Sequence, residues 1–133
     1  MHPLFLKANS LTGEVIGAAI EVHRLMGAGL IESIYEKCMR RELEFRQLSS
    51  LNQRAVEIEY KGFKFEEALR FDLLIEGCVL LELKSVESVV SIHKAQLFSY
   101  MKLLDVPLGL LINFRTAKLV DGVHRMMLPG ADE

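Results

Sequence analysis

The most distinctive hydrophobic pattern in the chain is a pair of apolar runs, residues 71–75 and 79–83, separated by a short stretch that contains a glycine. Each run has the length of a strand, and the glycine favours a tight turn between them. Charged residues interrupt the pattern at Asp72, Glu82 and Lys84. Because an ionic group in so apolar a stretch is costly unless it is paired or binds a metal, we expect a β-hairpin that carries a functional site.

The length of the connecting loop decides which side chains of this hairpin meet. If the loop is residues 76–78, residue 75 pairs with 79 and Asp72 pairs with Glu82. Directly opposed residues in antiparallel strands point to the same face, so the two carboxylates converge. Lys84 lies two residues beyond Glu82 and shares that face. A two-residue turn would separate the carboxylates, so the hypothesis requires an odd-numbered loop or a bulge.

Periodicity elsewhere predicts the remaining helices and strands. Helices are expected over three segments: Ser10 or Thr12 to Met26, Leu30 to Arg46, and Ser91 to Leu104 with Ser88 or Ser91 as its cap. Strands are expected over five segments: 54–60, 63–75 with room for a bulge, 79–83, 108–114, and an edge strand or hairpin within 118–128. The segments left over are expected to be an N-terminal arm at 1–10, a polar linker at 47–53 and a flexible tail at 129–133.

This order, α-α-β-β-β-α-β-β, predicts an α/β (α+β) fold in which helices flank one mixed central β-sheet. The length of 133 residues fits a single domain spanning 1–133. Half of the residues are hydrophobic and 26% are charged, the balance of a soluble globular protein. No apolar run reaches the roughly 18 residues of a membrane span, so no membrane partner is expected.

The cysteine content bears on the cellular compartment of the protein, and the net charge bears on its binding partners. Cys38 and Cys78 have no metal-type spacing, which favours two buried thiols in a cytoplasmic protein, and the N-terminus is a poor signal peptide. The net charge of −2 gives no global basic excess for binding DNA. Affinity for nucleic acid would have to come from a local basic patch or from a partner.

Two carboxylates and nearby main-chain carbonyls make an oxygen-rich site of the kind Mg²⁺ prefers. Such an ion polarises a phosphoryl oxygen and lowers the pKa of a bound water, and Lys84 beside it could orient that water or stabilise transition-state charge. Spacing alone leaves a second interpretation open, a salt bridge of Lys84 on the sheet surface. Acid-x-Lys triplets are common, and Glu59-Tyr60-Lys61 is another in this chain.

Several motifs resemble those of the GxxExxY proteins of the PD-(D/E)XK nuclease-like superfamily. They are GLIESIY at 29–35, FDLLIE at 71–76, LELKSVE at 81–87, HKAQLFSY at 93–100 and LGLLINF at 108–114. Phe71 stands where the family name has proline, and Ala28 replaces a proline frequent between the two glycines. Neither departure removes a catalytic group. The resemblance implies a restriction-endonuclease-like core.

The resemblance also implies a role for each matching residue. Asp72 corresponds to the motif aspartate, and Glu82 and Lys84 to the acid-x-Lys pair. The other implied site residues are Glu32, as a helix-borne acid near the metal, Leu83, through its main-chain carbonyl, and Gln96 and Tyr100, as a QxxxY element near DNA. A plainer interpretation makes Tyr100 a core residue and Gln96 a polar edge.

Two functional hypotheses follow. In the first, the chain is a nuclease that hydrolyses DNA with Mg²⁺ or Mn²⁺, with Asp72, Glu82, Leu83 and Glu32 as metal ligands. In the second, it is a non-catalytic module that retains the nuclease fold and binds nucleic acid or protein. A homodimer or a larger complex is compatible with either hypothesis.

Overall fold

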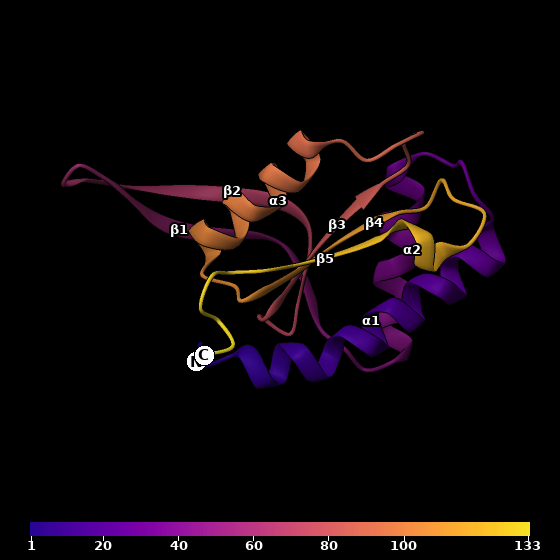
Figure 1. Ribbon diagram of the computed structural model, residues 1–133, viewed down its shortest axis with the longest axis horizontal. Coiled ribbons are helices and arrows are strands. Elements are labelled where there is room, and N and C mark those ends of the chain that lie inside the picture. Colours follow the sequence, from indigo (N-terminus) through magenta and orange to yellow (C-terminus); the bar gives the residue numbers. More distant parts are fainter.

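A computed structural model describes all 133 residues as one five-stranded mixed sheet with helices on both faces (Figure 1). The helices are α1 (Phe5–Met26), α2 (Glu32–Phe45) and α3 (Ser91–Leu104), with a 3₁₀ turn at Leu119–Gly122. The strands are β1 (Ser50–Tyr60), β2 (Phe63–Ile75), β3 (Val79–Lys84), β4 (Leu108–Asn113) and β5 (Val123–Met127). The expected fold class and element order are confirmed. No helix has the length and apolar content needed to cross a membrane.

The strands lie side by side in chain order, and only β3 and β4 are parallel. Helix α3 connects these two strands, as a parallel pair requires a crossover. It covers one face of the sheet, while α1 and α2 cover the other. All six residues of β4 are buried because both faces of this strand are covered.

The sheet divides the core into two clusters. Alternate side chains of β3, such as Leu81 and Leu83, pack toward α1 and α2, whereas Leu80 packs toward α3. Gly109 of β4 lies under α3, where a Cβ atom would come within 2.6 Å of the Met101 sulfur. The apolar runs seen in the sequence are therefore strands buried on both sides.

The hairpin between β2 and β3 has the predicted register. Ile75 pairs with Val79 and Leu73 with Leu81, so the loop has three residues, with positive φ at Glu76 and Gly77. Pairing between the two strands stops at Leu73 and Leu81, yet β3 continues beside β4 as far as Lys84. The two hairpin strands thus separate and form a fork.

A bulge lies in β2 next to this fork. Leu51 of β1 pairs with Leu74, but Gln53 pairs with Arg70, so β2 advances four residues while β1 advances two. The bulge changes which residues of β2 face α3: Leu74 does so before it, and Phe71 and Leu69 do so after it. Beyond the bulge, β1 and β2 extend from the body as a two-stranded ribbon (Figure 1).

The start of the chain differs from the expectation. Helix α1 begins at Phe5, so most of the N-terminal segment 1–10, which was expected to be irregular, is helical. The reason is that Phe5 and Ala8 continue the buried stripe of the helix toward its N-terminus. The Ser10 hydroxyl donates to the Lys7 carbonyl within the helix and is not a cap. Thr12 also lies inside the helix and is buried.

Three other boundaries differ as well. Strand β1 begins at Ser50, inside the predicted linker. The residue that caps α3 is Val90 and neither predicted serine, and its backbone N–H donates to the His93 ring. The tail packs beside the N-terminus (Figure 1): Ala131 is buried, and its carbonyl accepts a hydrogen bond from the His2 N–H.

Candidate active site

The fork between β2 and β3 opens into a cavity of about 390 Å³. Strand β2 supplies one wall and α3 the other, with β3 between them. The cavity is lined by Arg70, Phe71, Asp72, Glu82, Gln96 and Tyr100. Four of the side chains proposed from the sequence therefore share one cavity.

The carboxyl groups of Asp72 and Glu82 interact directly. Burial and the neighbouring charge of Asp72 raise the pKa of Glu82 to about 8. Burial also raises the pKa of Asp72, while the Leu83 N–H, which donates to its Oδ2 atom at 2.7 Å, acts in the opposite direction. The interaction between the two side chains lowers the pKa of Asp72 and raises the pKa of Glu82. At neutral pH the pair consequently holds one proton between two acids.

Lys84 lies beside this pair. Its Nζ atom is 3.9 Å from Glu82 Oε1, and the side chains are 17% and 22% exposed, so the contact is half-buried and not on the open sheet surface. Its positive charge lowers the pKa of both carboxyl groups. Lys84 makes no other ion pair, which leaves its ammonium group available to a substrate anion.

Glu32 adjoins the same centre from the opposite helix layer. It is the first residue of α2, and its Oε2 atom accepts a hydrogen bond from the Ser85 N–H at 3.3 Å. Its charge contributes to the raised pKa values of Asp72 and Glu82. No three Asp, Glu, His or Cys side chains are grouped closely enough to hold a metal, so Glu32 does not complete a three-ligand set.

The donor set at the fork still fits a hard divalent cation. Mg²⁺ commonly binds one or two carboxylates and keeps several waters. The shared proton of Asp72 and Glu82 marks a position where positive charge relieves repulsion between two acids. A cation in that position would replace the proton.

Helix α3 contributes Gln96 and Tyr100 to the cavity wall. His93, the first residue of the HKAQLFSY segment, accepts a hydrogen bond from the Val90 N–H. The sequence reasoning did not single out Arg70 and Phe71 as site residues, although both line the cavity. The two-residue spacing of Arg70 from Asp72 would place both on one side of a regular strand, but the bulge interrupts the alternation between Arg70 and Leu74, so the sequence held no reliable signal for Arg70.

The tyrosine of the GxxExxY motif has a structural role. The Tyr35 hydroxyl donates to the Gly27 carbonyl at 2.5 Å and accepts from the Leu30 N–H at 3.0 Å, and the ring stacks on Phe114. These contacts fix the turn between α1 and α2. They thereby fix the start of α2, where Glu32 lies.

Asn113 has a similar role at the end of β3. Its Oδ1 atom accepts from the Val86 and Arg115 N–H groups, and its Nδ2 atom donates to the Val86 carbonyl. The side chain holds the segment that follows Lys84. Neither Asn113 nor Tyr35 reaches the cavity, and both position elements that do.

Comparison with known protein families identifies the superfamily of the chain. Residues 9–126 match the family described as the PD-(D/E)XK nuclease superfamily. Because this match covers most of the sequence, the chain belongs to the PD-(D/E)XK nuclease superfamily. The narrower resemblance to the GxxExxY proteins stays a prediction.

The fold is also similar to a solved protein, in the crystal structure of SSO0001. The two share 17% sequence identity with a TM-score of 0.59, over 92% of this chain. The chain spans 63% of the length of that protein. At this identity the likeness supports the fold alone. No curated protein matches the sequence.

Proposed function

We propose that the chain is a divalent-metal-dependent nuclease that hydrolyses DNA phosphodiester bonds. Membership of the superfamily supports the reaction class. The observation that carries the proposal is the pair of acids Asp72 and Glu82, which both line the cavity and have raised pKa values, with Lys84 beside Glu82. A structural salt bridge does not require two acids to share a proton.

The groups that would hold Mg²⁺ or Mn²⁺ are the carboxylates of Asp72 and Glu82 and the Leu83 main-chain carbonyl, with Glu32 assisting. When bound, the ion supplies a polarised phosphoryl oxygen and a water of lowered pKa. The proton shared by the two acids must leave before both can act as ligands, so the affinity for the metal should rise with pH. The Leu83 N–H keeps the Asp72 carboxyl group oriented through its hydrogen bond.

Four further side chains would position the DNA. Lys84 would donate to the phosphate oxygen that gains negative charge, because it lies beside the acids without another anionic partner. Arg70 places a guanidinium at the cavity wall, a local positive group in a chain whose net charge is −2. Gln96 and Tyr100 would contact the nucleotide from α3.

A cleavage assay tests the proposal. Purified wild type should cut linear, circular or single-stranded DNA with Mg²⁺ or Mn²⁺, and EDTA should abolish the activity. The Asp72→Ala and Lys84→Ala variants should lose at least about a hundredfold in rate while their circular dichroism spectra match wild type. Lys118→Ala, a change outside the cavity, is the matched control and should retain activity. A wild type that cuts no DNA with any divalent metal would refute the proposal.

The second candidate is a non-catalytic module that keeps the nuclease fold. The absence of a ready-made three-ligand group and the negative net charge favour it. Calorimetry separates the two candidates. The nuclease should bind Mn²⁺, and Asp72→Ala should abolish that binding, whereas a non-catalytic module should bind no Mn²⁺ or bind it equally well in both proteins.

A further inference from the structure

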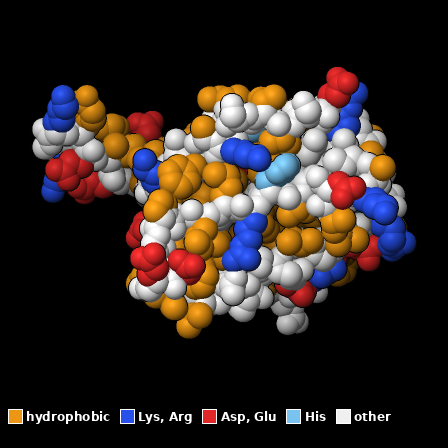
Figure 2. Space-filling model, in the orientation of Figure 1, with side chains coloured by type: hydrophobic (Ala, Val, Ile, Leu, Met, Phe, Trp, Pro, Cys, Tyr) orange, Lys and Arg blue, Asp and Glu red, His pale blue; other side chains and the backbone are white.

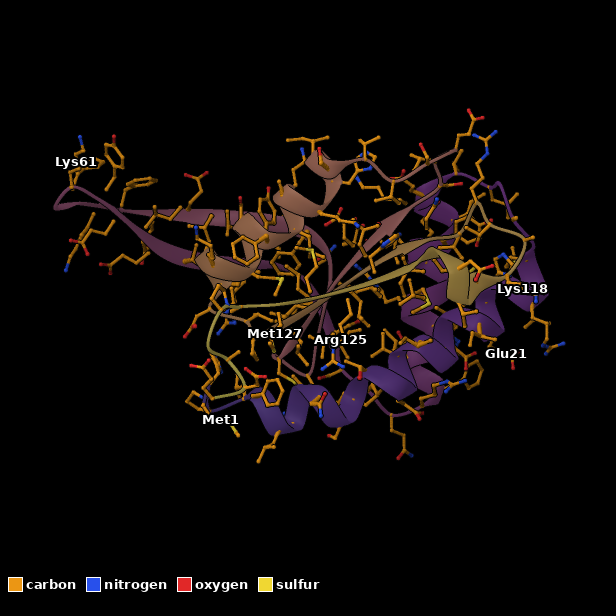
Figure 3. All side chains as sticks on the ribbon, in the orientation of Figure 1. Met1, Glu21, Lys61, Lys118, Arg125 and Met127 are labelled. Carbon is orange, nitrogen blue, oxygen red and sulfur yellow. The ribbon has the colours of Figure 1, made fainter.

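The ribbon formed by residues 54–69, called the arm below, has no partner in the fold over most of its length. Past the bulge, β1 and β2 pair only with each other, from Arg54 opposite Leu69 to Tyr60 opposite Phe63. Figure 2 shows the arm standing out from the body of the protein, and Figure 3 labels Lys61 at its tip. A two-stranded ribbon is only marginally stable by itself, so a ribbon of this length without a partner in the fold suggests a binding function.

One face of the arm is aromatic. Val56 packs against the core beneath α3, which places its neighbours on the same side of the sheet. The pairing of Tyr60 with Phe63, and of Ile58 with Phe65, puts all of these side chains on that side. Tyr60 and Phe63 are each 65% exposed and Phe65 is 37% exposed. We call the three rings the aromatic face.

Charge is distributed unequally between the two faces of the arm. The face opposite the rings pairs Glu57 with Glu66 and Glu59 with Lys64, so it is acidic. The aromatic side carries Glu67, opposite Val56, but also Arg54, opposite Leu69, and it ends at Lys61, whose ammonium group lies 5.5 Å from the centre of the Tyr60 ring. A polyanion would therefore meet less repulsion on the aromatic face than on the other.

The aromatic face lies on the same side of the sheet as the carboxyl pair. The bulge in β2 produces this continuity, because it turns Phe71, Leu69 and the alternate residues before them toward the side of α3. Arg70 and Phe71 belong to the cavity wall and lead directly into the arm. Phe65 is seven residues from Asp72, which corresponds to about 23 Å along a strand. A chain-like substrate seated in the cavity could follow the arm over this distance.

We infer that the arm binds single-stranded DNA, with unpaired bases stacked on Tyr60, Phe63 and Phe65 and the phosphates near Lys61. The choice of occupant rests on the proposed nuclease function, since the arm extends from the wall of that site. Every base has a flat π-face, and exposed rings beside basic groups bind unpaired bases with little sequence preference. In a duplex the bases are already stacked, so a single strand or a single-stranded end is the form that the rings recognise.

Fluorescence anisotropy with a labelled oligonucleotide tests the inference. The oligonucleotide should be long enough to reach from the cavity to the tip, and EDTA should be present so that binding is measured without cleavage. Tyr60→Leu and Phe63→Leu keep an apolar side chain but remove the ring, and each should weaken single-strand binding about tenfold. Phe63→Trp should bind at least as tightly as wild type. Glu59→Gln, on the acidic face, is the control and should not weaken binding.

The outcomes separate this inference from the proposed function. Wild-type affinity in both leucine variants, or no single-strand binding by wild type, overturns the role of the arm even if the protein cuts DNA. Weakened binding in those variants supports single-stranded DNA binding by the arm even if no cleavage is found. The competing occupant is a second copy of the chain. Light scattering that shows a dimer in wild type and a monomer in the leucine variants, with DNA binding unchanged, would assign the arm to that copy.

Discussion

Stability measured against pH offers a test of the carboxyl pair that needs neither metal nor DNA. In the folded chain the pKa of Glu82 is about 8, against an ordinary value of 4.5. The folded protein therefore keeps a proton on this group that the unfolded chain releases. Glu82→Gln removes the titrating group and keeps the size of the side chain.

The sign and the size of the effect follow from proton linkage. A raised pKa stabilises the fold fully below pH 4.5, and this stabilisation is lost as the pH rises toward 8. Across that window the free energy of unfolding should fall by about 1.4 kcal/mol per pH unit, with a ceiling of about 5 kcal/mol in total. Asp72, whose pKa is also raised, adds in the same direction.

Urea denaturation followed by circular dichroism, at several pH values from 5 to 8 in EDTA, measures this slope. The Glu82→Gln variant should be nearest to wild type in stability at pH 5 and should exceed it by an increasing amount up to pH 8. His124 has a lowered pKa that produces a slope of the opposite sign. Because both proteins contain His124, their difference isolates Glu82. Exposed Glu66→Gln is the control and should keep the wild-type slope. Equal slopes of unfolding free energy against pH in wild type and Glu82→Gln would refute the conclusion that Glu82 keeps a proton in the folded chain.

Three further predictions concern the elements that position the site, and denaturation midpoints check each of them. Tyr35→Phe removes a buried hydroxyl that makes two hydrogen bonds and should cost about 1–3 kcal/mol of stability, so an unchanged midpoint would contradict its role in the turn. Asn113→Ala leaves the N–H and carbonyl of Val86 unpaired and should cost about 2 kcal/mol, an expectation that fails if Asn113→Ala is as stable as wild type. Gly122→Ala would place a Cβ atom 2.1 Å from the Asn113 carbonyl oxygen, and should cost about 3 kcal/mol. Gly109→Ala meets side-chain atoms alone, the Met101 sulfur at 2.6 Å and two Leu97 methyl carbons at 3.3 Å, which can move, so it should cost less, and the reverse order would contradict the packing.

The apolar alternation and the glycine located the turn of the hairpin, but they left its length open between two and three residues. The metal-site hypothesis required an odd-numbered loop, and the structure confirms a loop of three residues through the pairing of Leu73 with Leu81. The buried strand at 108–113 was equally clear, since an uninterrupted apolar run of that length has few alternatives. The predicted strand pairing of Asp72 with Glu82 does not form, because the ladder between β2 and β3 ends at Leu73 and Leu81, but both acids still line the cavity at the fork.

Features that depend on distant contacts were not predicted. Helix α1 starts early because Phe5 and Ala8 meet core residues far along the chain, and no local cap marks that start. The two-residue bulge opposite Asn52 has no signal of its own, and it decides which way the arm faces. Arg70 could be assigned to the site only from the structure, which shows the cavity at the fork between β2 and β3.

A crystal of the protein soaked with Mn²⁺ above pH 8 tests the central claim most directly, through the anomalous signal of the ion. The account predicts one ion between the Asp72 and Glu82 carboxylates, which lose their shared proton at that pH. An ion bound elsewhere, or two carboxyl groups that stay apart with no ion between them, would contradict it.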